Sequence, residues 1–459
     1  MIIFIPIEIK IREFLPKLYL AYKILKYTNN EIIFGGQRFI SYNIESFSNC
    51  LWFDKHTLYK RLEKRGIHIN NKIIALDEEG PMSMAQEASK YHYKKNLTKL
   101  LNLILLWGIK DKIILNKSDY KKSVSVGHPK FDLVADAKNI FKNEIGYIKK
   151  RYKNFVFIPG HLSLRDNTNA IKAFYKSLLG GYSSKNRIIQ QVLNRNIVEK
   201  KNYILFLKTV IKIAKLNPKT CFVFRHHPLE DINKLNAILK DKPKNLILDY
   251  KFSISPWIIS CNYFLHAGCT SCLEAFSAKK KILFFRSKEI SRLNRYNKLK
   301  LSNWNFTSQN KICNFFRNIE KRKYETIKKP EEIVKNLTGK YKFYKEFIKL
   351  LKKVKFKDKS NIIYGQNKKN SKNIFLNLKK IIRSLLSEIK QKIFLKTFLI
   401  NLVPERHIYS KDYANLKFKS IETREINNFF RIQKKVNNDN IRINVKKISE
   451  SVYHFSKIR

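Results

Sequence analysis

NYFLHAGCTSCLEAFSAKKKILFF (residues 262–285) is the stretch of this sequence that decides the fold. It begins with an apolar strand, NYFLHAG (262–268), continues as a helical segment at roughly 270–278, and ends in a second apolar strand, KKILFF (280–285). Short apolar strands that alternate with amphipathic helices indicate a parallel sheet with helices on its faces. The stretch therefore predicts one strand–helix–strand unit of a doubly wound α/β domain.

The same alternation extends toward the N-terminus as far as residue 150. Its strands are NFVFIPG (154–160), TCFVFRHHP (220–228) and NLILDY (245–250), and its further helices lie at roughly 196–216 and 230–240. Residues 150–330 are therefore expected to form one Rossmann-like domain. Because ligands of such sheets bind beyond the carboxyl ends of the strands, the residues that end strands are the candidate functional residues.

A second alternating block occupies residues 1–135. Helices are predicted at 11–27, 56–66 and roughly 86–106, and strands are predicted at 31–36, 71–80 and 111–117. The turn residues of VGHPKFDLV (126–134) mark the end of the block. Two such blocks in tandem predict an α/β protein in which two Rossmann-like domains face each other across a cleft.

Residues 331–459 are expected to form a Lys-rich, mainly helical extension. Within it, SKNIFLNLKKIIRSLLSEIKQKIF (371–394) places its apolar residues on one face of a helix. That face either packs on the core or lies on an anionic membrane surface.

The chain has 459 residues and a formal net charge of +58. An excess of Lys and Arg suggests nucleic acid as a partner, but a chain rich in Lys, Ile and Asn and poor in Gly and Pro is also what an AT-rich genome produces. No zinc-finger, RRM or KH signature accompanies the charge, so nucleic-acid binding is the least favoured interpretation.

The sequence predicts no secretory or membrane-spanning segment. The N-terminal MIIFIPIEIKIREF is interrupted by charges from position 8 onward, and no apolar run approaches the roughly 20 residues of a membrane span. A cytoplasmic protein, at most peripheral to the inner face of the membrane, is expected. Six cysteines in so long a chain do not suggest a disulfide framework, and Cys269 and Cys272 form a lone CxxC pair.

Arg225-His226-His227-Pro228 ends the strand predicted at 220–228. A guanidinium and imidazoles at a strand end can hold a phosphate or protonate a leaving group, although a polar strand end stopped by proline has the same sequence. Pro159-Gly160-His161 ends another strand of the sheet, where Gly160 would let the backbone approach a ligand closely.

The turn after strand 262–268 offers a second candidate phosphate site. The strand ends at Gly268, and Thr270 and Ser271 precede a helix whose free backbone N–H groups attract anions. Glu274, one turn into the helix, would reach a ribose hydroxyl. Alternatively, Ser271 and Glu274 form an ordinary capping box.

Asp77-Glu78-Glu79-Gly80 ends the strand predicted at 71–80. Adjacent carboxylates repel each other, which would raise the pKa of one of them and let it act as a general base near neutral pH. A solvated acidic turn is the alternative. The sequence does not distinguish Glu78 from Glu79 as the base.

These motifs resemble the trio found in bacterial sialyltransferases and polysialyltransferases: an acidic pair before Gly, a His-Pro, and a Ser/Thr pair that opens a helix. More closely, the chain resembles the bacterial family of surface carbohydrate biosynthesis proteins. The matching stretches extend over almost the full length and are PIEIKIREFLPKLYLA (6–21), ALDEEG (75–80), VGHPKFDL (126–133), FRHHPLED (224–231), HAGCTSCLEAFSAKKKILFF (266–285) and LKFKSIETREI (416–426).

The resemblance implies a glycosyltransferase of the GT-B type, in which the first domain binds the acceptor and the second binds a nucleotide-activated sugar. It also implies a role for each matching residue: Glu78 or Glu79 as general base, His227 at the donor phosphate and at its departure, Thr270 and Ser271 as hydroxyls on that phosphate, and Glu274 at the ribose. Two departures weaken the donor contacts near one helix end: Lys130 stands where the family usually has Arg, and residues 277–280 replace a run of small apolar-Gly-Lys/Arg-Pro.

The sequence does not determine the donor. Similarity to sialyltransferases suggests a CMP-linked acidic sugar, with a growing surface polysaccharide or a lipid-linked glycan as acceptor. No Asp-x-Asp clamp is present and Asp77-x-Glu79 comes nearest, so a required metal is not expected and Mg²⁺ stays open. A polyol-phosphate (CDP-glycerol-type) transferase and a UDP-sugar epimerase on a related fold are the alternatives.

Overall fold

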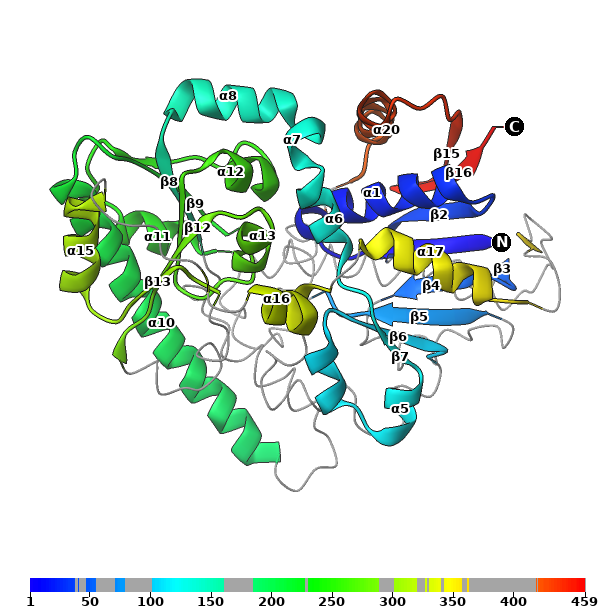
Figure 1. Cartoon of the computed structure of the whole chain (residues 1–459), viewed down its shortest axis with the longest axis horizontal. Coiled ribbons are helices and arrows are strands. Elements are labelled where there is room, and N and C mark those ends of the chain that lie inside the picture. The colour runs from blue at the N-terminus through cyan, green and yellow to red at the C-terminus, as the bar shows by residue number, and fades with distance from the viewer. Residues whose placement is uncertain are drawn as a thin grey trace, which may run out of the picture.

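Two mainly parallel sheets and the helices that cover them make up the computed structural model of this chain (Figure 1). The residues that the structure describes are 1–37, 40, 47–54, 71–78, 101–160, 185–227, 230–288, 301–319, 327, 330–339, 342–356, 361–362, 418 and 420–458.

The first sheet has eight strands in the order β15-β16-β2-β1-β4-β5-β6-β7. Its parallel strands are β1 (Ile2–Ile7), β2 (Glu31–Gly36), β4 (Leu51–Asp54), β5 (Lys72–Leu76), β6 (Leu103–Leu106) and β7 (Ser123–Ser125). The sequence of β1 is apolar throughout and every residue of it is buried, as expected for a central strand covered on both faces. The strand order reverses between β2 and β4 on either side of β1, so the carboxyl end of β1 is the switch point of this sheet.

The second sheet has six parallel strands in the order β10-β9-β8-β11-β12-β13. They are β10 (Leu246–Leu248), β9 (Cys221–Arg225), β8 (Phe155–Pro159), β11 (Tyr263–His266), β12 (Lys281–Phe285) and β13 (Trp304–Phe306). The helices among the described residues of this half are α10 (Lys185–Leu216), α11 (Ile232–Ile238), α12 (Ile254–Ser260), α13 (Cys272–Ser277) and α15 (Gln309–Arg317). Five of the strands and three of the helices lie where the sequence predicts them. The expectation of an α/β protein with two Rossmann-like sheets is confirmed.

Three successive helices lead from the first half into the second: α6 (Pro129–Ala135), α7 (Ala137–Ile140) and α8 (Lys142–Tyr152). α6 contacts α13, while α7 and α8 contact α12. One hydrophobic cluster therefore includes side chains of both halves, among them Leu18, Phe131, Trp257 and Leu273. This shared packing fixes the position of one sheet, and of the residues at its carboxyl edge, relative to the other sheet.

The C-terminal part of the chain returns to the first sheet. α17 (Phe343–Lys353) contacts α1 (Lys10–Tyr27) and α6, and β16 (Val452–Lys457) pairs antiparallel with β2. β15 (Ile443–Ser449) completes the edge, and α20 (Thr423–Asn437) lies beside α1 (Figure 1). The described part of 331–459 is thus built into the first half, where we expected a helical extension. The helix predicted at 371–394 lies outside the described residues.

Two local predictions in the first half are wrong. Residues 103–106 form strand β6 rather than the end of a helix, because a short apolar run fits a buried strand and a buried helix equally well. Residues 111–117 form part of η4 (Ile109–Ile114) and the start of α5 (Lys117–Lys121) rather than a strand. The segment 126–134 contains the start of α6 at Pro129, since proline is favoured in the first turn of a helix. The domain end expected near residue 135 stays a prediction.

The remaining elements are a short pair, β3 (Phe47–Ser48) with β14 (Asn361–Ile362), and the turn made of α16 (Pro330–Ile333) and η7 (Val334–Thr338). None of the helices in the described part of the chain is both long and apolar enough to cross a bilayer.

Candidate functional site

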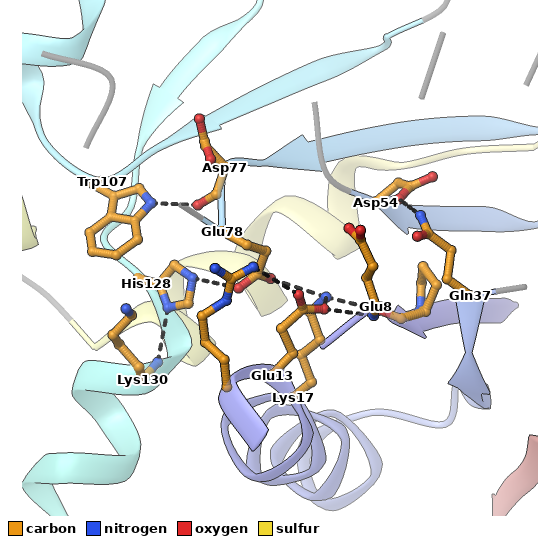
Figure 2. Close-up of polar contacts among 12 residues, drawn as sticks. Glu8, Glu13, Lys17, Gln37, Asp54, Asp77, Glu78, Trp107, His128 and Lys130 are labelled. Atoms are coloured by element: carbon orange, nitrogen blue, oxygen red, sulfur yellow. Dashed lines mark hydrogen bonds and ion pairs between the residues drawn. The ribbon is translucent and has the colours of Figure 1, made fainter. Parts of the chain in front are cut away.

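Glu78 lies between two basic side chains at the carboxyl edge of the first sheet (Figure 2). Its Oε1 is 3.0 Å from Lys17 Nζ, and its Oε2 is 3.0 Å from His128 Nε2. Lys17 comes from α1, and its ammonium also contacts Glu13 Oε2 at 3.1 Å and donates to the carbonyl of Pro6 at 2.8 Å. The three elements that follow β1, β5 and β7 therefore meet at this carboxylate.

The hydrogen bonds around His128 define its tautomer. The backbone N–H of Lys130 donates to His128 Nδ1 at 3.2 Å, so the ring proton is on Nε2 and is donated to Glu78. Burial lowers the pKa of His128 to about 4, and the ring is neutral at pH 7. Burial opposes ionisation of Glu78 as well, but Lys17 and His128 outweigh it and hold the pKa of Glu78 well below its ordinary value.

The expected raised pKa in the acidic turn does not occur at Glu78. Its carboxylate is paired with the ammonium of Lys17 rather than with a second carboxylate, and an opposite charge at this distance favours the ionised form. Glu79 lies outside the described residues, so the expectation for that carboxyl stays a prediction.

Trp107 supports the same turn through a hydrogen bond and a ring contact. Its Nε1 donates to the carbonyl of Asp77 at 2.6 Å, and its ring lies 4.4 Å from that of His128. Lys130 Nζ lies 4.6 Å above the indole, a cation–π distance. Trp107 thus connects the acidic turn to the start of α6.

At the carboxyl ends of β8 and β9 in the second sheet, a second group of polar residues gathers. The backbone N–H of Gly160 donates to the carbonyl of Arg225 at 2.6 Å, which joins the two strand ends. The guanidinium of Arg225 donates to the carbonyl of Phe252 at 3.0 Å, and burial lowers its pKa to about 10. Among the described residues, Arg225 Nε is buried without a hydrogen-bond partner. The His226 ring meets the exposed ring of Tyr250 edge-on, at 4.6 Å between centroids.

The strand β11 is followed by a glycine turn and then by α13, as the sequence predicts, but the predicted side-chain cap of the helix is absent. Gly268 has φ +120°, a conformation that glycine adopts readily, and its N–H donates to His266 Nδ1 at 3.2 Å. Ser271 makes no side-chain cap, so the capping-box alternative is not realised; its hydroxyl contacts Cys269 Sγ at 2.9 Å instead.

The CxxC pair has little thiolate character. Burial raises the pKa of Cys269 to about 11 and raises that of Cys272 well above its ordinary value. Because the thiolate is the reactive species, these cysteines are suited to packing rather than to thioredoxin-like exchange.

Glu274 stands where the two halves meet. It is 9% exposed on α13, and burial raises its pKa, with Lys130 and Arg225 acting in the opposite direction. Lys130 belongs to α6 of the first half and Arg225 to β9 of the second, and α6 contacts α13. The buried carboxyl of Glu274 therefore lies near two cations, one from each half of the molecule.

The structure brings Gly160, Arg225, His226 and His227 together at neighbouring strand ends, and places Gly268, Thr270, Ser271 and Glu274 at the α13 turn. Glu79, His161 and Pro228 lie outside the described residues. Reasoning from the sequence missed Lys17, Glu13, His128 and Glu230. Their signal was available in part, since the matching stretches 6–21, 126–133 and 224–231 contain them.

Within the described residues, no group of three or more His, Cys, Asp or Glu side chains is arranged to hold a metal ion.

Comparisons with known proteins agree with the fold. No family model and no curated protein matches the sequence. Among solved structures, a variant of the wall teichoic acid polymerase TagF matches with a TM-score of 0.51 and 12% identity, over 77% of this chain and 88% of that one. The UDP-GlcNAc 2-epimerase of Methanocaldococcus jannaschii matches at 0.49 and 12%, over 77% and 100%. MnaA of S. aureus with UDP matches at 0.47 and 10%, over 77% and 95%. The chain has the GT-B-like fold.

Proposed function

We propose that this protein is a glycosyltransferase that transfers a sugar from a nucleotide-activated donor to a surface polysaccharide or a lipid-linked glycan. The observation that carries the proposal is the buried group Arg225, Glu274 and Lys130 where the halves meet. Arg225 has an unused, buried N–H that suits a phosphate oxygen, and a buried carboxyl beside it suits the hydroxyls of a ribose. A nucleoside phosphate supplies both groups at once.

The second half would hold the donor. Arg225 and the hydroxyls of Thr270 and Ser271 would bind the phosphate, and Glu274 would accept from the ribose. As the bond from the anomeric carbon to the phosphate oxygen breaks, His227 would donate a hydrogen bond or a proton to that oxygen. Fixed donors of this kind stabilise the charge that develops on a leaving group.

The first half would activate the acceptor. A carboxylate removes the proton from an acceptor hydroxyl, whose oxygen then attacks the anomeric carbon. Both oxygens of Glu78 are engaged by Lys17 and His128, and its pKa is low, so Glu78 is better suited to orienting the acidic turn than to taking a proton. We therefore assign the base to Glu79.

A thermal-shift screen against CMP-, UDP-, GDP- and dTDP-sugars tests the proposal. A ligand at about 100 times its Kd stabilises the native state by about 2.7 kcal/mol, which is a readily measured shift. We expect a CMP-sugar to give the shift, and Arg225→Met to abolish it. Arg317→Met, on the exposed side of α15, is the matched control and should keep it. The absence of a shift with all four donors would contradict the proposal.

A second candidate is favoured by the likeness in fold to TagF, a wall teichoic acid polymerase, and by the 2-epimerases among the matches. Polyol-phosphate transfer would consume CDP-glycerol, and epimerisation would isomerise UDP-GlcNAc with no acceptor present. Incubation with each compound, followed by chromatography of the products, separates these activities from sugar transfer.

A further inference from the structure

Glu230 is a buried carboxyl beside the donor residues that the roles above leave unused. It is 7% exposed and lies just before α11. Its Oε1 accepts from the hydroxyl of Tyr203 on α10 at 2.8 Å, and its Oε2 accepts from the backbone N–H of His227 at 2.9 Å. The backbone N–H of Glu230 in turn donates to the carbonyl of His227 at 2.9 Å.

These bonds fix both sides of His227. Its N–H and its carbonyl are each held by Glu230, so the backbone has little freedom to rotate at this residue. Tyr203 is 2% exposed, and its ring packs against Phe206 on the same helix. The carboxyl therefore ties the His227 turn to a rigid, buried point of α10.

Gly160 permits this arrangement. A Cβ at Gly160 would lie 2.5 Å from His227 N and 2.6 Å from Glu230 Oε2, too close for either atom. The end of β8 thus passes directly against the hydrogen bond between Glu230 and His227. This close approach of the backbone explains why glycine follows β8 at position 160, and no ligand is needed to account for it.

We propose that Glu230 is a positioning residue for His227: its carboxyl holds the His227 peptide on α10 and so sets the direction in which the imidazole meets the donor phosphate. The inference rests on the role proposed for His227. The new element is that the carboxyl of Glu230, three residues away, sets the orientation of the His227 imidazole through hydrogen bonds to the His227 backbone. A misplacement of about 1 Å at such a group can cost about 100-fold in rate.

Three variants of the full-length protein test this: Glu230→Ala, Glu230→Gln and Asp231→Asn. Ala removes both acceptors. Gln keeps an oxygen for the His227 N–H, while its NH₂ can donate to the Tyr203 hydroxyl. Asp231 is the adjacent carboxylate and accepts from the N–H of Lys234 at 3.1 Å, a cap that Asn preserves, so Asp231→Asn is the matched control.

Two measurements are made on each variant. The first is the imidazole signal of His227 in protein with isotope-labelled histidine, assigned by its loss in His227→Gln. The second is kcat and KM with the donor identified above. We expect Glu230→Ala to move the His227 signal and lower kcat about 100-fold with little change in KM. Glu230→Gln and Asp231→Asn should stay near the wild type in both.

The outcomes separate the positioning role of Glu230 from the proposed function. An unmoved His227 signal with unchanged kcat in Glu230→Ala would overturn the positioning role. An equal loss of kcat in Glu230→Gln would overturn it too, because such a loss would indicate proton transfer by Glu230 itself. The spectrum needs no donor, so a wild type that turns over no nucleotide sugar would contradict the proposed function alone.

If Glu230→Ala fails to fold, Tyr203→Phe provides a second test, because it removes the hydrogen bond to Glu230 Oε1. This variant should shift the His227 signal to a smaller extent. No shift in Tyr203→Phe would also overturn the positioning role of Glu230.

Discussion

At the residue scale, the main feature is the buried charge at Glu78. The side chains of Glu78 and Lys17 are 3% and 4% exposed, and a pair so far from water must be fully compensated. The compensation comes from Glu13, from the carbonyl of Pro6 and from the His128 N–H. An acidic motif that looks like a solvated turn in sequence is thus the centre of a buried network.

Removing one member of this network should cost more than removing an exposed lysine. We expect Lys17→Met to lower the free energy of unfolding by about 3–5 kcal/mol, because the buried Glu78 carboxylate then loses the ammonium beside it, while Glu13 keeps its contact with Arg12. Lys349→Met is the matched control, since Lys349 pairs with Glu346 on an exposed face and should cost at most about 1 kcal/mol. Urea denaturation of both variants gives the comparison, and equal losses would count against a structural role for the buried pair.

His128 should make the fold sensitive to acid. Its pKa is about 4 in the folded chain and near 6.5 when exposed, so the unfolded state binds more protons between these values. Stability is therefore expected to fall as the pH is lowered from 6.5 to 4, by up to about 3 kcal/mol. Urea titrations at pH 7 and pH 4.5 should show a smaller difference for His128→Gln than for the wild type; an identical pH dependence would contradict the assignment.

At the scale of elements, glycines decide how closely two backbones approach. β2 ends in Gly35-Gly36, and Gly35 is paired with Val452 of β16. A Cβ on Gly35 would lie 2.1 Å from the carbonyl oxygen of Ser451. A pair of glycines after a strand therefore serves strand pairing here, with a segment more than 400 residues away in sequence.

Gly35→Ala should destabilise the protein by about 3 kcal/mol, since the strand ends must separate to admit the methyl group. Gly146→Ala is the control: Gly146 lies in α8 with nothing near the position of its Cβ, and alanine there should stabilise by about 0.5–1 kcal/mol. Opposite signs in the two thermal melts are expected. A Gly35→Ala protein as stable as the wild type would show that β16 does not pack here.

At the scale of the whole molecule, the two halves and the C-terminal segment share one core. Phe455 of β16 is fully buried, with its ring 5.4 Å from Phe34 of β2 and 5.2 Å from Phe430 of α20. Tyr453 donates to the carbonyl of Ile421 at 2.7 Å and joins β16 to the segment before α20. Residues 420–458 are therefore part of the first half.

Phe455→Ala should cost about 3–5 kcal/mol, as expected for a large cavity in a packed core. Lys447→Ala, on the exposed side of β15, should change stability by no more than about 0.5 kcal/mol. Denaturation followed by intrinsic fluorescence measures both. A small effect of Phe455→Ala would indicate that the C-terminal segment is dispensable for the first sheet.

Sequence patterns alone predicted five strands and three helices of the second half, because strands such as β8, β9, β11 and β12 are short apolar runs bounded by polar or glycine residues. They did not predict β13, α12 or α15. The sequence also identified the strand-end motifs, since a parallel sheet places functional residues there. It did not distinguish β6 from a helix, because its four residues are apolar on every face.

Which residues come into contact depends on the tertiary structure. Glu78, Lys17 and His128 are separated by up to 111 positions, and only the parallel order of β1, β5, β6 and β7 brings them within hydrogen-bond distance. The sign of the pKa shift at Glu78 follows from that meeting. The proximity of Lys130 to Glu274, and of Phe455 to Phe34, likewise comes from packing between segments that local sequence patterns cannot relate, since such patterns report periodicity along one segment.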